Sequence, residues 1–464
     1  MPAGTAPPSG MRDFLPEDVR RREYVIGIIK RVYERYGFEP LETPAAENLE
    51  TLLGKYGDEE KLIFKILRRG EHEATGQADL ALRYDLTVPL ARVVAQYQAK
   101  LPRPFKRYQI QPVWRADRPG RGRFREFYQC DVDSLGSTSP VVEAELCGAV
   151  ADAMTELGFS DFVIRLNHRQ LLTAMLDSRG VKPNEHMATL VTLDKLDKVG
   201  REGVEKELEA RGRSRDAIEA LMELFAPPQP SAATISKAME GLRNAYAPSP
   251  ASVVRDALKG LLDAVPHGQS AIANLKEIVT LAEQTKAKGR ITFDRSLARG
   301  LSYYTGAIME LNVDGIGSLG GGGRYDNLIG MFSGQQIPAC GFSLGLERIL
   351  VVMTERGMFP PSLATSPADV MVATFDAAGA GPAMRIADQL RQSGLRVMVY
   401  PDPDRIGKQI KYADGRGIPF VAILGEDEIR AGRVTIKNLA DRTQQTYEQS
   451  EAGAAIREAL QQRG

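Results

Sequence analysis

The sequence contains little cysteine or histidine and has no long apolar run. Among its 464 residues are three cysteines, at positions 130, 147 and 340, and four histidines. The cysteines are far apart and form no CxxC pair, which excludes a zinc cage and a disulfide framework and indicates a reducing compartment. We expect Cys147 and Cys340 to be small buried hydrophobic side chains.

No run of ~18 apolar residues marks a membrane span, and the first residues show no charged-then-apolar leader. We therefore expect a cytoplasmic protein that does not bind membranes.

An excess of charge of either sign is also missing. Lysine and arginine together number 60, as do aspartate and glutamate, so nucleic acid can bind only to local patches. One such patch spans residues 103–125, where eight basic residues accompany a single acid, Asp117. The basic residues are Arg103, Lys106, Arg107, Arg115, Arg118, Arg121, Arg123 and Arg125. A run of charge is usually a solvated surface, but the interleaved aromatic residues, such as Phe124 and Phe127, favour a binding site here.

The length predicts two to four domains, and hydrophobic periodicity indicates their first elements. Residues Pro16–Tyr36 carry apolar side chains at helical spacing, and Phe38–Pro44 is typical of a strand that ends at proline. From Leu80 to Val88 apolar and polar residues alternate, which predicts a strand with Asp85 on its polar face.

Two further alternating segments, Tyr108–Trp114 and Phe124–Val132, predict an antiparallel hairpin with a basic loop at 118–122. On the second strand Tyr128, Cys130 and Val132 are expected to form the packed face. The opposite face then presents Arg125, Phe127, Gln129, Asp131 and Asp133. We expect this polar row to carry the chemistry of the protein.

The middle of the chain differs from the preceding part in its composition. From about 170 to 288 it consists of charged helical segments with proline-rich breaks at 226–230 and 247–250, which indicates an inserted helical module. Strand signals return at Gly306–Val313, and the glycine run at 320–323 predicts a loop. Segment 360–368 is typical of a linker, and the βαβαβ pattern beyond it predicts a small α/β domain.

The arginines of the basic patch suit a nucleoside triphosphate. Guanidinium groups bind phosphate oxygens in pairs and neutralise the triphosphate while it reacts at the α-phosphorus. Arg115 ends the first strand of the hairpin, and Phe127 on the second strand is placed to stack on a base. A carboxylate that attacks phosphorus is already ionised at pH 7 and needs no general base. This agrees with the lack of a Ser-His-Asp or Cys-His arrangement in the sequence.

A second informative passage is Leu297–Gly306. It places Arg299 beside Tyr303 and Tyr304, a combination that suits a small planar polar group. Together with the basic patch, it points to an enzyme that activates an amino acid with ATP.

These passages resemble the motifs of the histidyl-tRNA synthetases, a family of class II aminoacyl-tRNA synthetases. The run to Pro44 resembles motif 1, Arg115–Asp133 resembles motif 2, and Gly341–Leu350 resembles motif 3. Leu297–Gly306 and Gly321–Asp326 resemble the two histidine-specific motifs. Two C-terminal segments resemble the anticodon-binding domain of this subgroup: Lys408–Asp414 and Gly425–Glu428.

The resemblance implies an α+β fold, in which an antiparallel sheet is flanked by helices and carries a helical insertion and a C-terminal α/β anticodon-binding domain. The implied limits are a catalytic domain at 1–172 and 289–359, an insertion at 173–288, a linker at 360–368 and an anticodon-binding domain at 369–464. It also implies a homodimer that forms through motif 1.

The resemblance assigns roles to individual residues. Histidine is expected to contact Asp85, Leu86, Thr87, Gln129, Asp133, Tyr303, Tyr304 and Tyr325. Within this set the segment 85–87 holds the α-amino group, and Asp133 bonds an imidazole nitrogen. ATP, with Mg²⁺ bridging its outer phosphates, is expected to contact Arg115, Asp117, Arg123, Arg125, Phe127 and Arg348. Arg115 and Arg299 are the implied catalytic residues at the α-phosphate, and no protein-held metal site is expected. The tRNA is expected to contact Arg118, Arg121, Lys408 and Lys411.

Two alternatives stay open at this point. A non-catalytic paralogue with a regulatory role would share the fold, although such proteins tend to lose the histidine-specific arginine or the anticodon-binding domain. A class II synthetase for another amino acid would share motifs 1 to 3. Histidine-dependent exchange between ATP and pyrophosphate distinguishes the charging of histidine tRNA from both.

Overall fold

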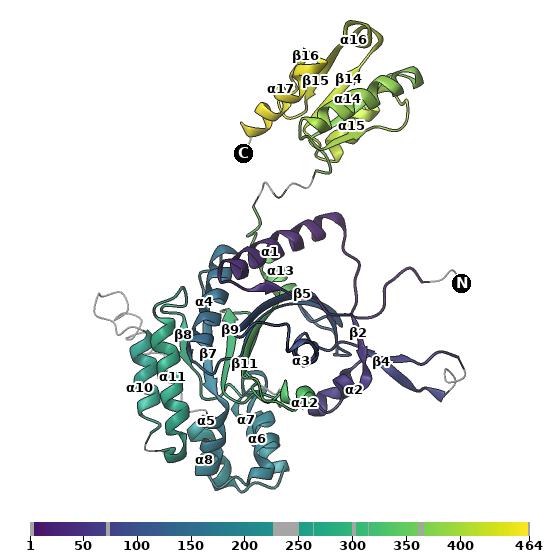
Figure 1. Cartoon of the computed structure of the whole chain (residues 1–464). Helices are drawn as coiled ribbons and strands as arrows, with labels where there is room; N and C mark the ends of the chain where they lie inside the picture. Colours follow the sequence, from purple (N-terminus) through teal and green to yellow (C-terminus); the bar gives the residue numbers. More distant parts are fainter. Residues whose placement is uncertain are drawn as a thin grey trace. The chain divides into compact units, whose positions relative to one another are not determined.

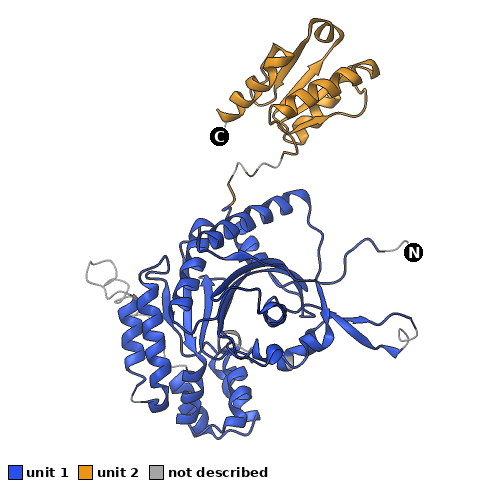
Figure 2. Cartoon of the chain, viewed as in Figure 1, with its two compact units in different colours: residues 1–358 blue, residues 359–464 orange. Residues whose placement is uncertain are grey.

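The computed structural model describes residues 4–70, 75–225, 250–262, 264–298, 303–313, 315–360, 363 and 366–462. The chain divides into two compact units, Met1–Met358 and Phe359–Gly464 (Figure 2). Each unit has its own sheet and its own core, and they are described separately. The limits predicted for an inserted domain, 173–288, stay a prediction.

The first unit is built on a large mixed sheet (Figure 1). Within the described residues its strand order is β1-β5-β6-β11-β10-β9-β7-β8. The strands are β1 (Glu39–Pro40), β5 (Phe105–Trp114), β6 (Glu126–Leu135), β7 (Phe162–His168), β8 (Ile291–Phe293), β9 (Ala307–Val313), β10 (Gly317–Arg324) and β11 (Ala339–Gly345). The central pairs are antiparallel, and only the outer pairs β1–β5 and β7–β8 are parallel. The predicted antiparallel sheet is therefore confirmed.

The predicted hairpin is confirmed as β5 and β6, which are paired from Phe105 opposite Leu135 to Trp114 opposite Glu126. Because side chains alternate across a strand, Cys130 and Val132 point to one face of the sheet. Three helices pack against that face, namely α1 (Pro16–Arg35), α4 (Val141–Glu156) and α13 (Leu346–Glu355). The polar row of β6 is thereby left on the opposite face, where the cavity described below is located.

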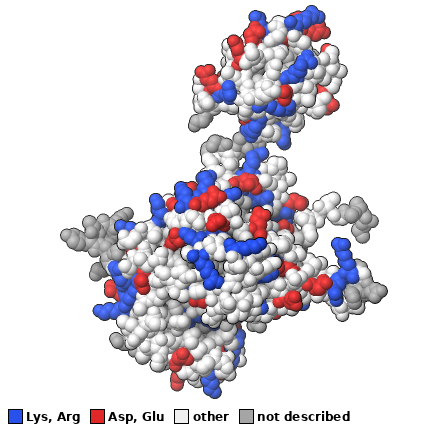
Figure 3. Space-filling model, in the orientation of Figure 1, with Lys and Arg blue, Asp and Glu red and all other residues white. Residues whose placement is uncertain are grey.

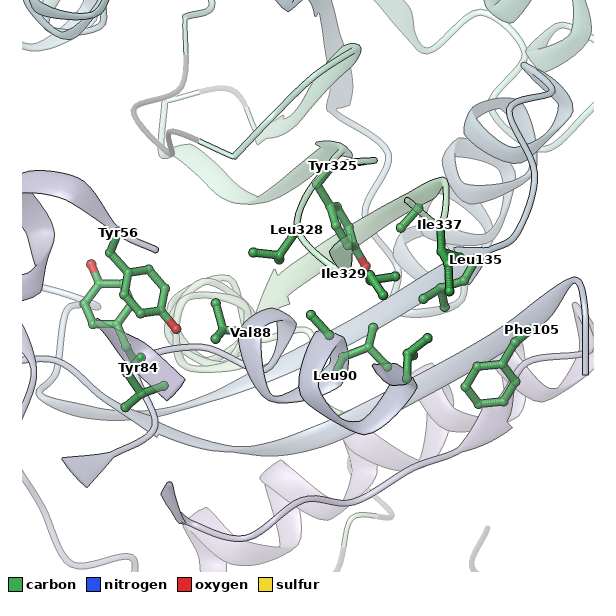
Figure 4. Close-up of a cluster of buried hydrophobic side chains, with 14 of the residues drawn as sticks. Tyr56, Tyr84, Val88, Leu90, Phe105, Leu135, Tyr325, Leu328, Ile329 and Ile337 are labelled. Atoms are coloured by element: carbon green, nitrogen blue, oxygen red, sulfur yellow. The ribbon is translucent and has the colours of Figure 1, made fainter. Parts of the chain in front are cut away.

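Helix α3 (Thr87–Tyr97) lies within the curve of the large sheet (Figure 1). Its Val88 and Leu90 belong to a buried cluster with Phe105 and Leu135 of the hairpin (Figure 4). A small sheet of order β2-β4-β3 flanks this cluster. The elements around it are β2 (Ala46–Asn48), α2 (Leu49–Leu52), η1 (Gly57–Leu62), β3 (Lys65–Leu67), β4 (Ala78–Leu82) and α12 (Gly330–Ser333).

The prediction of one continuous strand from Leu80 to Val88 is wrong. Strand β4 ends at Leu82 and α3 begins at Thr87. Asp85 stabilises the start of the helix, because its carboxylate accepts the backbone N–H of Val88 at 3.0 Å. Arg83 is also fully buried, with its guanidinium donating to backbone carbonyls of Thr43, Pro44 and Pro112.

The loop predicted at the glycine run is also wrong, because residues 320–323 lie within strand β10. Glycine is needed there for close approach between strands. A Cβ atom at Gly322 would collide with the carbonyl oxygen of Gly341, and one at Gly323 would lie 2.5 Å from the carbonyl oxygen of Ala307. The lack of side chains leaves open space above the centre of the sheet.

The charged helical region between β7 and β8 is confirmed for the described residues. It contains α5 (Arg169–Ser178), η3 (Pro183–Glu185), α6 (His186–Leu193), α7 (Leu196–Ala210), α8 (Arg215–Phe225), α10 (Pro250–Lys259), η4 (Pro266–Gly268) and α11 (Gln269–Ala282). Of the two proline-rich breaks, 226–230 and 247–250, all residues except Pro250 lie outside the described residues.

The second unit has the predicted βαβαβ start and then a hairpin and a helix. Its elements are β12 (Val370–Thr374), η5 (Ala377–Gly379), α14 (Ala380–Gln392), β13 (Val397–Val399), α15 (Ile406–Gly415), β14 (Phe420–Leu424), α16 (Glu426–Ala431), β15 (Arg433–Asn438), β16 (Gln444–Glu448) and α17 (Gln449–Gln461). The sheet order is β13-β12-β14-β15-β16, with parallel pairing around β12. Separate apolar clusters form around Val372 and around Val421.

Two further expectations were tested. Cys130, Cys147 and Cys340 are all free and buried. In the described part of the chain, no helix has the length and apolar character needed to cross a membrane. Lys and Arg are interspersed with Asp and Glu on the visible face of each unit (Figure 3).

Candidate active site

A cavity of about 400 Å³ lies on the polar face of the large sheet. Its walls come from segments far apart in sequence, including η1, β6, β10, β11 and the start of α13. Many of the predicted site residues line it: Asp85, Thr87, Arg115, Asp117, Arg123, Phe127, Gln129, Asp133, Tyr303, Tyr304, Tyr325 and Arg348. The fold therefore brings the hairpin, the histidine-specific motifs and motif 3 to one place.

One end of the cavity is organised around Asp85. The Tyr56 hydroxyl donates to Oδ1 of Asp85 at 2.9 Å, and the Tyr303 hydroxyl lies 3.5 Å from Oδ2. Burial raises the pKa of the Asp85 carboxyl, while the N–H of Val88 and the charge of Arg115 oppose the shift. The neighbouring Leu86 is fully buried and does not line the cavity. Asp85 thus forms an acceptor site at the wall, held in place on two sides.

Three tyrosines form an aromatic wall beside this end. The ring centroids of Tyr303 and Tyr304 are 5.1 Å apart, and those of Tyr303 and Tyr325 are 6.1 Å apart, both in edge-to-face geometry. Such contacts fix ring orientation. The wall suits a flat ring of small size.

The floor of the cavity consists of polar side chains on β6. Gln129, Asp131 and Asp133 are each at least 92% buried, with exposed fractions of 8%, 2% and 2%. Beneath them Arg107, which is 0% exposed, pairs its Nη2 with Asp133 at 2.9 Å and approaches Asp131 to 4.0 Å. Burial raises the pKa of Asp131 to about 7, and Arg107 opposes that shift. Burial also raises the pKa of Asp133, again against the effect of Arg107.

Arginines also line the cavity, and Arg115 lies close to Asp85. Nε of Arg115 donates to the carbonyl of Tyr84 at 3.0 Å, and its guanidinium lies 4.3 Å from the Tyr84 ring and 5.2 Å from the Phe127 ring. Arg348 donates to the carbonyl of Ser318, and a Cβ atom on Gly122 would lie 3.3 Å from Cγ of Arg348. The loop of the hairpin therefore lies directly over the start of α13.

Glu347 is a buried acid beside this loop. Its carboxylate accepts the backbone N–H of Tyr128 at 2.9 Å, which links α13 to β6. Burial raises the pKa of Glu347 to about 7.

Some predicted contacts are placed elsewhere. Arg125 does not line the cavity, because its side chain donates to the carbonyls of Asp117 at 3.1 Å and Ser9 at 3.2 Å. It therefore fastens the N-terminal segment to the hairpin loop. Arg121 is exposed and pairs with Glu355, and Arg118 is exposed. Arg299 lies outside the described residues, although Leu297 and Ala298, which precede it, are buried.

In the second unit Lys408 and Lys411 lie on exposed positions of α15. Nζ of Lys408 pairs with Asp404 at 2.7 Å, and the Tyr400 hydroxyl donates to the same carboxylate at 2.8 Å. The buried Gln409 on the same helix bonds both the N–H and the carbonyl of Thr374. The helix that carries both lysines is thus firmly attached to the end of β12.

The sequence predictions missed three cavity-related residues. Tyr56 was not singled out, Arg107 was named only as part of the basic patch, and Asp131 was placed on the correct face but given no role. The alternation of β6 is the signal that identifies Asp131. No local signal identifies Tyr56, which meets Asp85 only through the fold. In the described ranges no cluster of His, Cys, Asp and Glu has an arrangement that holds a metal ion.

Comparisons with known proteins agree with this geometry. The family model for histidyl-tRNA synthetase matches residues 10–349, and the model for an anticodon-binding domain matches residues 369–459. A histidine–tRNA ligase of Gloeobacter violaceus is 41% identical over 474 residues, which cover 96% of this chain and 97% of the relative. A histidine–tRNA ligase of Christiangramia forsetii is 40% identical and covers 93% of this chain and 94% of its own.

Solved structures give the same picture. The histidyl-tRNA synthetase of Nostoc sp. PCC 7120 superposes with a TM-score of 0.77 at 30% identity, covering 98% of this chain and 99% of its own. A protein of Bacillus halodurans described as an ATP phosphoribosyltransferase regulatory subunit/histidyl-tRNA synthetase superposes with a TM-score of 0.68. It covers 89% of this chain and 97% of its own, and its 22% identity indicates a shared fold only.

Proposed function

The chain belongs to the histidyl-tRNA synthetase family and attaches histidine to tRNA with ATP, and we propose how its residues divide this work. The activity proceeds through a histidyl-adenylate. The observation that carries the proposal is one cavity, lined together by buried acceptors, three tyrosines and arginines. A purely regulatory role is not favoured, because the full-length relatives are ligases.

Histidine occupies the end of the cavity near Asp85. The carboxylate of Asp85, with the segment through Leu86 and Thr87, receives the α-ammonium group. Tyr303, Tyr304 and Tyr325 enclose the imidazole, and Gln129 and Asp133 belong to the floor below it. An isostere of histidine that lacks the matching donors binds poorly, because the buried acceptors would then stay unpaired.

ATP occupies the adjoining part of the cavity, with its α-phosphate at Arg115, next to the histidine site. Phe127 stacks on the adenine from one side and Arg348 covers the other, while Asp117 and Arg123 contact the base and the outer phosphates. Arg125 acts through the loop, since its guanidinium is bonded to the carbonyls of Asp117 and Ser9. ATP enters as its Mg²⁺ complex, as is general for triphosphate substrates.

The first step is attack by a histidine carboxylate oxygen on the α-phosphorus. A new P–O bond forms, the bond from the α-phosphorus to the bridging oxygen breaks, and pyrophosphate leaves with that electron pair. Arg115 and Arg299 stabilise the charge that develops on the α-phosphate oxygens. No base is required, because the carboxylate is ionised at neutral pH.

In the second step a terminal ribose hydroxyl of histidine tRNA attacks the acyl carbon. An ester bond forms, the bond from the acyl carbon to the phosphate oxygen breaks, and AMP leaves with that electron pair, while a phosphate oxygen of the adenylate takes the hydroxyl proton. Arg118 and Arg121, exposed at the hairpin loop, contact the acceptor end of the tRNA. Lys408 and Lys411 on α15 contact phosphates near the anticodon, in the unit that matches the anticodon-binding domain.

The active form is a homodimer in the cytoplasm, formed through motif 1 and the small sheet next to it. Large apolar side chains are exposed on this part of the first unit: Leu53 (37%), Ile66 (36%), Leu67 (52%) and Leu80 (38%). Contact between two copies would cover them. Sedimentation of the full chain tests this, and a monomer at micromolar concentration would contradict it.

The decisive experiment is ATP–pyrophosphate exchange measured with each of the twenty amino acids, followed by charging of histidine tRNA. Only histidine is expected to support exchange. Exchange with a different preferred amino acid, or no exchange with any, would overturn the assignment.

A further inference from the structure

The segment before α1 lies against the hairpin loop. The carbonyl oxygen of Gly10 accepts the backbone N–H of Arg125 at 2.7 Å, and the carbonyl oxygen of Ser9 accepts Nη1 of Arg125 at 3.2 Å. A Cβ atom at Gly10, where φ is +81°, would lie 2.8 Å from Cγ of Arg125 and 2.9 Å from Cγ of Pro119. The two segments are therefore in direct contact, and this contact requires a glycine.

Arg12 extends the contact to a side chain of the cavity. Its guanidinium lies 4.1 Å from the centroid of the Phe124 ring and 4.5 Å from that of the Phe14 ring. Its Nε is buried and has no hydrogen-bond partner among the described residues, so cation–π attraction to the two rings holds this end of the side chain. Phe124 belongs to the hairpin loop and lines the cavity. Arg12 thus supports a wall of the cavity from outside it.

A second guanidinium continues this arrangement to β6. Arg22 of α1 lies 4.7 Å from the centroid of the Phe14 ring and 5.0 Å from that of the Tyr128 ring. Rings and guanidinium groups therefore alternate in the order Phe124, Arg12, Phe14, Arg22, Tyr128, which we call the Arg–aromatic stack. The stack connects the N-terminal segment and α1 to the hairpin at two points.

A buried acid lies close to the stack. Glu347 is 2% exposed and lines the cavity next to Arg348. Burial raises the pKa of Glu347 to about 7, and the N–H of Tyr128 and the charges of Arg12 and Arg22 oppose that rise. Its Oε1 is buried and has no hydrogen-bond partner in the described part of the chain. Because a buried carboxylate is unfavourable without a compensating cation, the two guanidinium groups stabilise its charged form.

The loop supported in this way carries proposed contacts of ATP. Asp117 and Arg123 line the cavity from this loop, and Arg348 lines it from the start of α13. The backbones of Gly120 and Arg123 exchange two hydrogen bonds of 3.0 Å, which shape the tip of the loop but do not attach it to another element. Groups that bind a charged substrate work best when they are held in place before it arrives. The Gly10 contact and the Arg–aromatic stack supply such an attachment.

We propose that residues 8–14 are a working part of the ATP site, and that Arg12 is the positioning residue that holds the hairpin loop in the geometry that ATP requires. Arg12 acts through Phe124 and Glu347 and touches no substrate. The proposal rests on the proposed function, since it assigns a support to the ATP contacts of that reaction. It makes the affinity for ATP, and not the affinity for histidine, depend on Arg12.

The test compares the unaltered full chain with Arg12→Ala, the conservative variant Arg12→Lys and the control Arg201→Ala. Arg201 lies on α7 and pairs with Glu205 of the same helix at 2.7 Å. Histidine-dependent ATP–pyrophosphate exchange gives kcat and separate KM values for ATP and for histidine. Backbone hydrogen exchange, measured by mass spectrometry with and without ATP and Mg²⁺, reports the order of the loop at 116–124. Thermal unfolding verifies that each variant is folded.

We expect Arg12→Ala to raise KM for ATP about 10-fold and to change KM for histidine by less than ~2-fold, because contacts with two rings and a buried carboxylate are lost together. The loop at 116–124 should exchange faster in this variant, and saturating ATP should restore most of the protection, since ATP favours the ordered loop. Arg12→Lys keeps the charge and should raise KM for ATP only about 3-fold. Arg201→Ala should leave every value unchanged.

Three results would overturn the proposal. These are an equal rise of both KM values in Arg12→Ala, an unchanged KM for ATP, or faster hydrogen exchange throughout the first unit instead of in the loop. If Arg12→Ala does not fold, Phe14→Leu removes a ring of the stack from outside the cavity and gives the same comparison. Failure of the proposed function is a different result, namely no histidine-dependent exchange by the unaltered enzyme.

Discussion

The hydroxyl of Tyr56 donates to Oδ1 of Asp85 across 2.9 Å. This bond joins the residue that precedes η1 to the connection between β4 and α3, two segments that the sequence separates by 29 positions. Both partners are almost fully buried, with exposed fractions of 2% and 3%. The carboxylate proposed to receive the amino group of the substrate is thus oriented by a residue from outside the synthetase motifs.

Tyr56→Phe should therefore weaken histidine binding. We expect KM for histidine to rise about 5- to 10-fold with kcat nearly unchanged, because one hydrogen bond to a charged group is lost. The measurement is ATP–pyrophosphate exchange as a function of histidine concentration. Tyr97→Phe, at a residue that is 41% exposed, is the control and should change neither constant. An unchanged KM in Tyr56→Phe would show that the bond does not orient Asp85 for binding.

The raised pKa of Asp131 predicts a pH-dependent gain in stability for Asp131→Asn. In the unfolded chain the carboxyl ionises near pH 3.9, whereas in the folded protein its pKa is about 7. Between these values folding takes up a proton, so the free energy of unfolding of the unaltered protein falls as pH rises. Below both values, and above both, this contribution is constant.

The stability of Asp131→Asn relative to the unaltered protein should consequently increase from pH 4 to pH 7 and then level off. The rise should be at most about 4 kcal/mol, since one pKa unit corresponds to about 1.4 kcal/mol. Urea unfolding at pH 5, 6, 7 and 8 measures it. A difference that is independent of pH would refute the assignment of this pKa.

Arg299 is proposed to act on the developing charge at the α-phosphorus. Arg299→Ala should slow adenylate formation by a factor of about 100 or more, which corresponds to roughly 3 kcal/mol of transition-state energy. Transfer from preformed histidyl-adenylate to tRNA should be affected much less. Rapid-quench measurement of the two steps distinguishes them. Equal slowing of both steps, or a change in histidine affinity alone, would count against this role.

The close packing of the glycine residues in β10 predicts a large loss of stability when one of them gains a side chain. Gly322→Ala places a Cβ atom against the carbonyl oxygen of Gly341, so β10 and β11 must separate at the centre of the sheet. We expect a loss of more than ~3 kcal/mol in the free energy of unfolding of the first unit.

The matched control is Gly407→Ala, in helix α15 of the second unit, where no atom lies within 4 Å of the added Cβ. That change should be neutral or stabilise by about 0.5–1 kcal/mol, through the higher helix propensity of alanine. Denaturation monitored in each unit gives both values, and similar effects at the two positions would be inconsistent with close approach at Gly322.

Lys408 and Lys411 are proposed to contact tRNA phosphates. Lys408→Ala and Lys411→Ala should each raise KM for tRNA and reduce the slope of log affinity against log salt by about 0.7–0.9. Histidine-dependent ATP–pyrophosphate exchange should stay unchanged, because it requires no tRNA. A salt slope equal to that of the unaltered enzyme would place both lysines outside the interface.

The sequence predicted the elements whose pattern is local. The alternation of β6 separates Cys130 and Val132 from Gln129, Asp131 and Asp133, and the structure confirms the hairpin. Helix α1 and the parallel strands of the second unit likewise follow from hydrophobic spacing. In each case the hydrophobic pattern that predicts the element is contained within that element or the one next to it in the sequence.

The errors arose where distant contacts decide the outcome. Gly320–Gly323 form a strand because other strands approach it closely, which no local rule reveals. The turn at Arg83 and Asp85 depends on carbonyls near residues 43 and 112. The bond that holds Asp133 comes from Tyr325, which is 192 positions away.

The most direct test of the account is a crystal structure of the full chain with histidinol and a non-hydrolysable ATP analogue. We expect the amino group within about 3.2 Å of Asp85, the ring between the three tyrosines and the floor formed by β6, and the α-phosphate beside Arg115. Electron density for either ligand outside this cavity would contradict the assignment of the site.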